Sequence, residues 1–268
     1  ISQQELRINQ QDKIIQQQQE RIYKNISLDR ELQKKEEGSE IMTEVKDLKL
    51  SNNKILKKYE FTSGFYAGIG NLFPGTGYID FYQGNIIVLS SRGILAFKNN
   101  IEDNEKNFKQ IKNNINEFIG MNQFKKNKAF SLKDLLIFNN KIFISYTEEI
   151  KENCWNTSII YGDINYDNIN FEKIFSPKEC VHSTNNIDKE FNALQSGGRI
   201  ISYDDDHILL STGDYRSRYL AQDNQSINGK IIKININKIN NNDYQIISMG
   251  HRNPQGLYFD KESNFILE

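Results

Sequence analysis

The chain has 268 residues, with 34 Lys and Arg against 35 Asp and Glu, so its formal net charge is -1. This balance excludes a nucleic-acid binder that works through a bulk surplus of positive charge. No run of about 18 apolar residues occurs and no secretory h-region is visible, so the sequence predicts neither a membrane span nor a signal peptide. The length suits one large domain or two small ones.

Residues 1–35 are rich in Gln, Glu, Lys and Arg and contain neither Gly nor Pro. Isoleucines recur there at a strict interval of seven, the spacing of one seam position in a coiled coil, whereas Gln holds the other seam position. Two interpretations stay open: a weak coiled-coil stalk that makes the protein a homo-oligomer, or a solvated single helix or disordered linker. The residues concerned are Ile1, Ile8, Ile15 and Ile22, with Gln4, Gln11 and Gln18.

Residues 36–60 are Lys-rich and are predicted to be a linker. The predicted domains are therefore a helical stem and linker at 1–60 and a β-rich part at 61–268. From residue 61 onwards, short apolar segments alternate with Gly, Asn and Asp turns, a pattern typical of an all-β sandwich, barrel or propeller.

Four segments of the β-rich part share one layout: a strand that ends in an aromatic residue, a polar turn, and a strongly apolar strand. The four aromatics lie 56, 65 and 56 residues apart, which suits one four-stranded propeller blade per repeat. We therefore predict an all-β protein with a β-propeller fold, preceded by the α-helical stem. A sandwich whose hairpins merely look alike is the alternative. The aromatics are Tyr82, Phe138, Tyr203 and Phe259.

A propeller closes from at least about four complete blades. Residues 61–268 hold about three to four repeats, and an open ring would expose the apolar face of a blade. We therefore expect further blades after Glu268, where the sequence stops within a strand pattern. Because the sequence starts at Ile1 rather than at Met, we also expect residues before it, and a membrane anchor there is compatible with the pattern.

The densest cluster of unusual residues lies between Gln195 and Gln255. It contains Gln-Ser-Gly-Gly-Arg at 195–199, Ser-Thr-Gly-Asp at 211–214, Asn-Gly-Lys-Ile-Ile-Lys-Ile at 228–234, and Gly-His-Arg-Asn-Pro-Gln-Gly-Leu at 250–257. The last segment contains a predicted turn that displays a guanidinium group and two amides. These groups suit a ligand with carboxylates and carbonyl oxygens, because Arg binds carboxylate bidentately and an amide both donates and accepts.

In this order, the four motifs resemble those of the soluble glucose/sorbosone dehydrogenase family, quinoproteins that use pyrroloquinoline quinone (PQQ) on a six-bladed propeller. The segment at 250–257 is close to a family signature. The resemblance is clearest over 190–268, extends over 61–190, and is absent in the stem. It implies PQQ and Ca²⁺ as cofactors and an aldose sugar as substrate, oxidised by hydride transfer from C1 to the quinone.

The resemblance also implies roles for single residues. Arg252 and Asn253 fall on positions that hydrogen-bond the reactive quinone oxygens, and Gln255 falls on a position that lines the cofactor pocket. Asp214 falls on a carboxylate that orients the catalytic His. Glu268 would open the loop whose backbone carbonyls hold Ca²⁺, so no metal ligand is expected before it.

The chain departs from the family at the catalytic base, where Gln195 stands in place of His. Gln has no titratable group near neutral pH, so it cannot accept a proton as a general base. The strand at 130–136 also lacks the (Gln/Gly)-Gly-Leu-Leu pattern that contributes to the substrate pocket in the family. An alternative function follows: a catalytically inactive propeller that acts as a carbohydrate-binding or surface-interaction module.

The remaining candidate site residues are possible metal ligands, the histidines and the two cysteines, and a catalytic role is less well supported for them. Asp204–Asp206 could ligate Ca²⁺, but acidic residues are ordinary in a turn. His251 is interpreted as structural, and His207 is expected at an exposed turn. Cys154 and Cys180 lie 26 residues apart without zinc-site spacing, and a disulfide between them is favoured over two free thiols. Such a bond would fit a periplasmic or extracellular protein.

Overall fold

The computed structural model describes residues 40–61, 77–99, 106–238 and 243–268. The predicted helical stem at 1–35 lies outside these residues, so both interpretations of it stay predictions. The described chain consists mostly of strands, with two short α-helices, α3 (Met121–Lys126) and α4 (Arg218–Gln222), and one 3-10 turn, η2 (Ile115–Glu117). Across the described ranges, no helix is both long enough and apolar enough to cross a bilayer.

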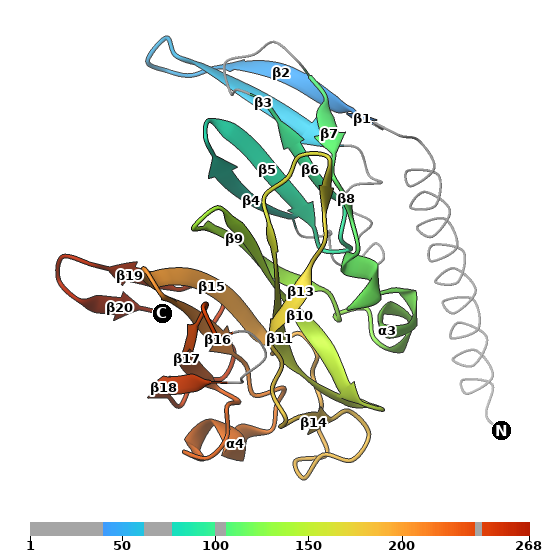
Figure 1. Cartoon of the computed structure of the whole chain (residues 1–268), viewed down its shortest axis with the longest axis vertical. Coiled ribbons are helices and arrows are strands. Elements are labelled where there is room, and N and C mark those ends of the chain that lie inside the picture. Colours follow the sequence, from blue (N-terminus) through green and yellow to red (C-terminus); the bar gives the residue numbers. More distant parts are fainter. Residues whose placement is uncertain (1–39, 62–76, 100–105, 239–242) are drawn as a thin grey trace.

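Three antiparallel sheets follow one another along the chain, and a hairpin begins a fourth (Figure 1). The first sheet holds β4 (Gly77–Tyr82), β5 (Asn85–Ser90), β6 (Leu95–Lys98) and β7 (Phe108–Gln110), with β1 (Glu40–Ile41) outermost. The second holds β9 (Leu132–Phe138), β10 (Lys141–Lys151), β11 (Cys154–Asp163) and β13 (Glu172–Phe175), with β14 (Val181–His182) also on β11. The third holds β15 (Gly197–Asp204), β16 (His207–Thr212), β17 (Lys230–Asn235) and β18 (Tyr244–Met249).

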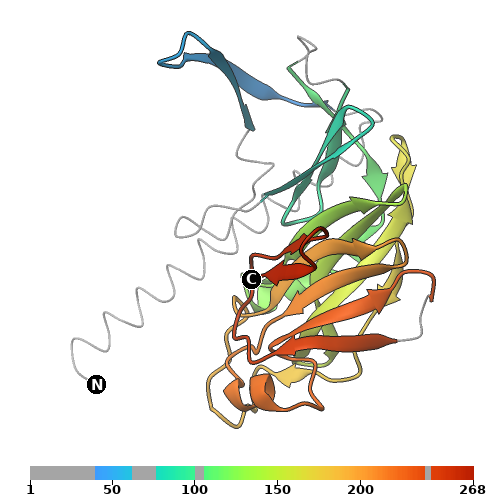
Figure 2. The same ribbon diagram turned by 90° about the vertical axis from the view of Figure 1, so that its left-hand side faces the viewer.

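The hairpin of the fourth repeat consists of β19 (Tyr258–Asp260) and β20 (Phe265–Leu267), and it lies beside β15 (Figures 1 and 2). Two further two-stranded pairs connect or flank the sheets: β2 (Thr43–Lys49) with β3 (Ile55–Phe61), and β8 (Lys112–Asn113) with β12 (Asn168–Ile169). The meandering four-stranded sheets are the blades of a propeller. The all-β propeller prediction is therefore confirmed, and three blades and the start of a fourth are present.

The predicted repeat matches the sheets. Each of the four aromatics lies at or near the end of the first strand of its sheet, directly before the turn to the second strand. The backbone is left-handed in two of these turns, with φ of 49° and 83° at Gln83 and Gly84 and 49° and 59° at Asn139 and Asn140. The rings of Tyr203 and Phe259 lie 4.6 Å apart, so neighbouring repeats also touch.

Residues 40–61, predicted to be part of a linker, instead form β1, β2 and β3. The many charged residues of this segment suggested a linker, but they form exposed ion pairs on the strand faces. Leu48 faces Leu56 in the β2–β3 register. At the base of the hairpin, the ring of Phe61 lies 4.7 Å from that of Phe108. Ile41 is buried in the same cluster. This segment therefore packs against the first blade.

Apolar side chains fill the spaces between neighbouring blades. One cluster contains Leu89 of the first blade with Leu135 and Trp155 of the second. A second cluster joins Phe143 of the second blade to Ile208 of the third. Each Å² of apolar surface that is buried contributes about 25 cal/mol to the free energy of folding, so these clusters are the main source of stability.

Two carboxylates on first strands bind the backbone of the next blade. Asp80 on β4 accepts a hydrogen bond from the backbone N–H of Ile137 on β9 at 2.6 Å. Asp134 on β9 accepts one from the N–H of Ile200 on β15 at 2.8 Å and pairs with the Arg199 guanidinium at 2.9 Å. These bonds fix the first strands of three blades relative to one another.

A disulfide joins Cys154 to Cys180, the pairing favoured from the sequence. Cys154 begins β11, and Cys180 directly precedes β14, whose two residues pair with β11 at its first two positions. The bond therefore attaches the short outer strand of the second blade to its neighbour.

Candidate functional site

Three of the four motifs meet in backbone contacts at the start of β15 and β19. The N–H of Asp214, which follows β16, donates to the carbonyl of Arg252 at 2.9 Å, and the N–H of Tyr215 donates to the carbonyl of Gln195 at 2.9 Å. Gly213 allows this approach, because a Cβ there would lie 2.1 Å from the Gln195 carbonyl oxygen. Gln195, Asp214 and Arg252 are therefore brought together, although they lie far apart in sequence.

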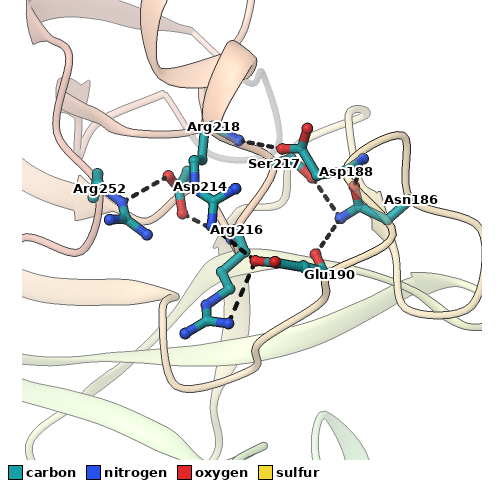
Figure 3. A network of polar contacts seen from close by, with 8 residues as sticks. All are labelled: Asn186, Asp188, Glu190, Asp214, Arg216, Ser217, Arg218 and Arg252. Atoms are coloured by element: carbon teal, nitrogen blue, oxygen red, sulfur yellow. Dashed lines mark hydrogen bonds and ion pairs between the residues drawn. The ribbon is translucent and has the colours of Figure 1, made fainter.

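Asp214 is the buried charge of the site, with no exposed surface. Its Oδ1 accepts a hydrogen bond from the backbone N–H of Arg216 at 2.8 Å, and its Oδ2 lies 3.7 Å from Nε of Arg252 (Figure 3). Among described residues, Oδ2 has no hydrogen-bond donor. Burial raises the pKa of Asp214, while the Arg216 N–H and the Arg252 charge oppose this rise. The carboxylate thus has one oxygen ready for a further donor.

Asn253 has a fixed orientation. Its Oδ1 accepts a hydrogen bond from the N–H of Gly197 at 3.1 Å, which leaves the two N–H groups of Nδ2 as donors. The adjoining Arg252 side chain is 55% exposed. Within the described part of the chain, Asp214 is its only side-chain partner. Two neighbouring residues therefore present amide and guanidinium N–H groups to a ligand.

Gln195 is half-buried, and its Oε1 has no hydrogen-bond partner among the described residues. The two unpartnered oxygens, Gln195 Oε1 and Asp214 Oδ2, are acceptors. A buried acceptor without a donor costs about 1–3 kcal/mol, so both would gain from a ligand or water that brings hydroxyl hydrogens. Gln255 is exposed at the rim of the same turn.

A charged layer that the motifs did not predict lies behind Asp214 (Figure 3). Glu190 pairs with Arg218 at 2.8 Å and with Arg216 at 3.4 Å, while Asp188 accepts the backbone N–H of Arg218 at 3.0 Å. Asn186 donates to Ser217 Oγ at 2.7 Å and to the carbonyl of Glu190 at 2.9 Å. The loop at 186–190 therefore holds the turn after Asp214, whose residues Tyr215 and Arg216 have φ of 50° and 70°.

The three histidines lie outside this arrangement. Nε2 of His251 is 2.9 Å from Ser248 Oγ, and its Nδ1 pairs with Glu268, which agrees with a structural role. His207, expected to be exposed, is half-buried because its Nδ1 pairs with Asp204 at 2.7 Å. His182 lies in β14. In the ranges that the structure describes, no group of three or more His, Cys, Asp or Glu is arranged to hold a metal ion.

Fold and site together define a propeller with a polar site where its first strands begin. A family model described as Glucose / Sorbosone dehydrogenase matches residues 130–268, which is half of the chain. The chain therefore belongs to the glucose/sorbosone dehydrogenase family. No curated protein sequence matches it.

The solved structures that resemble the chain support the fold. The soluble aldose sugar dehydrogenase from Escherichia coli in its apo form has a TM-score of 0.52 at 16% identity, over 70% of this chain and 55% of its own. The PQQ-bound aldose sugar dehydrogenase from Streptomyces coelicolor has a TM-score of 0.51 at 15% identity, over 69% of this chain and 53% of its own. The chain thus spans little more than half the length of these proteins.

Proposed function

We propose that the protein binds PQQ at the site of Arg252 and Asn253 and oxidises an aldose sugar there. The observation that carries this proposal is the orientation of Asn253, whose Oδ1 is held by Gly197 N–H so that its amide hydrogens are free for a ligand. Beside it, Arg252 has a largely exposed guanidinium group. Adjacent amide and guanidinium donors fit neighbouring carbonyl oxygens such as those of an ortho-quinone.

Bound PQQ would supply an acceptor for the two electrons and the hydrogen removed from a sugar alcohol. In this chain, Arg252 and Asn253 would hold the quinone oxygens, and Asp214 would keep the Arg252 side chain in place through its charge. The unpartnered oxygens of Gln195 and Asp214 suit the hydroxyl groups of a sugar. Ca²⁺ binding, through a loop that Glu268 would open, stays a prediction.

A second candidate function is a carbohydrate-binding or surface-interaction module without turnover. One observation favours it: Gln195 stands where the family has its catalytic His, and an amide cannot take up a proton near neutral pH. The charged layer around Asp214 would then only support a binding pocket.

Sugar-dependent reduction of a dye separates the two functions. The full-length protein is incubated with PQQ, Ca²⁺, an artificial electron acceptor and a panel of aldoses. Dye reduction by the wild type supports the oxidoreductase. No reduction, together with sugar binding in calorimetry, supports the module and contradicts our proposal.

We also propose a periplasmic or extracellular location. The Cys154–Cys180 disulfide supports this, because such bonds persist in oxidising compartments. Mass spectrometry of the protein from intact cells, alkylated before lysis, would show both cysteines protected from the reagent. Alkylation of both would contradict this location.

A further inference from the structure

The site lacks a titratable proton acceptor at Gln195. The side chain of Lys133, on the first strand of the second blade, contacts Gly198, which lies three residues after Gln195. A Cβ added to Gly198 would lie 2.3 Å from Lys133 Cβ, so this side chain covers the Gly198 backbone. The preceding residue, Gly197, donates its N–H to Asn253. The Gly197–Gly198 pair therefore contacts Asn253 through one residue and Lys133 through the next.

A bulge in β9 places Lys133. Ser145 on β10 pairs with Asp134, and Tyr146 pairs with Leu132, so Lys133 is the extra residue without a partner in the ladder. A bulge re-aims the side chain of the inserted residue, and bulges are common beside active sites. Gly198, with φ of 115°, provides the space that the re-aimed side chain needs.

The lysine amine points back toward the start of its strand. Nζ donates to the carbonyl of Ala129 at 2.9 Å, and Ala129 precedes β9 by three residues. Gln195 precedes β15, the first strand of the next blade, by two residues. Because first strands of neighbouring blades run alongside one another in a propeller, the amine of Lys133 lies at the same end of the propeller as Gln195.

The hydrogen bonds of Lys133 differ from those of Lys230, another lysine with an enclosed amine. Nζ of Lys230 donates to the carbonyls of Leu220, Ala221 and Asn228, which uses all three hydrogens of an ammonium ion. Nζ of Lys133 makes one hydrogen bond within the described part of the chain. Lys230 is thus held as a structural cation, whereas Lys133 can lose a proton without breaking a network.

Burial and the nearest charge both lower the pKa of Lys133. Burial, assisted by the positive charge of Arg92, lowers the pKa of Lys133 to about 7. The neighbouring carboxylates are engaged elsewhere, Asp134 with Arg199 and Asp80 with the Ile137 N–H. The facing groups on β10 and β15, Ser145 and Gly198, carry no charge. A general base is most effective with a pKa near the working pH.

We propose that Lys133 is the proton acceptor of this site, taking the place that Gln195 cannot fill. The inference rests on the proposed function. Oxidation of a sugar CH–OH to C=O breaks the C–H bond, whose electron pair and hydrogen leave together as hydride to a quinone-type oxidant. The O–H bond breaks as well, and its proton goes to the neutral amine of Lys133, which becomes an ammonium ion.

The first test compares Lys133→Met and Lys133→Arg in the full-length protein loaded with PQQ. Both variants are expected to lose about 100-fold or more in kcat/KM, the usual contribution of a general base. Arg keeps the length and charge but cannot deprotonate, so a merely structural lysine would be rescued by it. Adding Gln195→His to Lys133→Met is expected to restore turnover. Full activity of Lys133→Arg would overturn the proposal.

The second test does not depend on turnover. The protein is reductively methylated with ¹³C-formaldehyde, and the dimethyl-lysine signals are followed by NMR across pH. One signal titrating near pH 7, absent in Lys133→Met, is expected from the lowered pKa. Titration of every signal near pH 10 would overturn the inference while leaving the proposed function intact. Failure of the wild type to bind PQQ would overturn both.

Discussion

Asp134 offers a sharp test of the contacts between blades, because two effects on its carboxylate oppose each other. Its side chain is 2% exposed, and it lies 2.9 Å from Arg199. Burial favours the protonated acid, whereas Arg199 and the Ile200 N–H favour the carboxylate. Burial prevails and raises the pKa of Asp134 from 3.8 to about 6. The substitution Asp134→Asn removes this titration and keeps an oxygen for the Ile200 N–H.

The direction of the effect follows from proton binding. Between pH 3.8 and about 6 the folded protein holds a proton on Asp134 that the unfolded chain has released. The contribution of Asp134 is therefore fully present below pH 3.8 and is lost as pH rises through about 6. Each unit of pKa shift corresponds to about 1.4 kcal/mol, so the total change is about 3 kcal/mol.

Denaturant unfolding of the wild type and of Asp134→Asn at several values from pH 4 to pH 7 measures this difference. We expect the wild type to lose about 2.4 kcal/mol of unfolding free energy relative to the variant over that range, since part of the effect lies below pH 4. Arg199→Gln serves as a matched second variant. Without the guanidinium group, the loss should extend to higher pH. A difference that is constant with pH, or that favours the wild type as pH rises, would contradict a raised pKa of Asp134, since burial would then not outweigh the Arg199 pair.

The remaining predictions concern packing and the disulfide. Gly198→Ala should destabilise the protein by about 2–4 kcal/mol in thermal or denaturant unfolding, because the new Cβ meets Lys133 and strains the backbone. Gly256→Ala, where a Cβ meets nothing within 4 Å, is the control, and an equal loss in both would count against the contact. Replacing Cys154 and Cys180 together by Ser should cost about 3–4 kcal/mol, given the 26-residue separation. An unchanged denaturation midpoint would show that the disulfide does not stabilise the fold.

The sequence predicts the blades well because their pattern is local. Period-two apolar segments, aromatic strand ends and turn residues such as Asn139 and Asn140 lie within a few positions of one another. The hairpin at 43–61 could not be predicted from such a local pattern, because its strands are rich in Lys and Glu and its register depends on pairing across the turn. Its base is fixed by Phe108, far along the chain.

The site is predictable only in part. The motifs indicate that Gln195, Asp214, Arg252 and Asn253 belong to one site, and the structure brings these four together. Their roles stay predictions. The contact between Lys133 and Gly198 could not be predicted, since it depends on a bulge in one blade and a left-handed glycine in the next. The sequence feature that could have indicated a role for Lys133 is its position as the one lysine in the mostly apolar strand at 132–138.

The charged layer behind Asp214 also could not be predicted from the sequence. Glu190, Arg216 and Arg218 lie in ordinary polar loops, and nothing in their spacing shows that they meet. Their contacts arise because the loop that contains Glu190, between the second and third blades, lies against the turn between β16 and β17 of the third blade. Long-range proximity of this kind is set by the fold as a whole.

Calorimetric titration of PQQ into the full-length protein, with Ca²⁺ present, measures directly whether the site of Arg252 and Asn253 binds PQQ. We expect saturable binding by the wild type and a loss of about tenfold or more in affinity for Arg252→Met, since a charged hydrogen bond contributes about 1.5–3 kcal/mol. Lys46→Met is the matched control, because Lys46 forms an exposed ion pair with Glu60 on the β2–β3 hairpin, and its affinity should equal that of the wild type. Absence of PQQ binding by the wild type, or equal affinities of the Arg252 variant and the wild type, would contradict PQQ binding at Arg252.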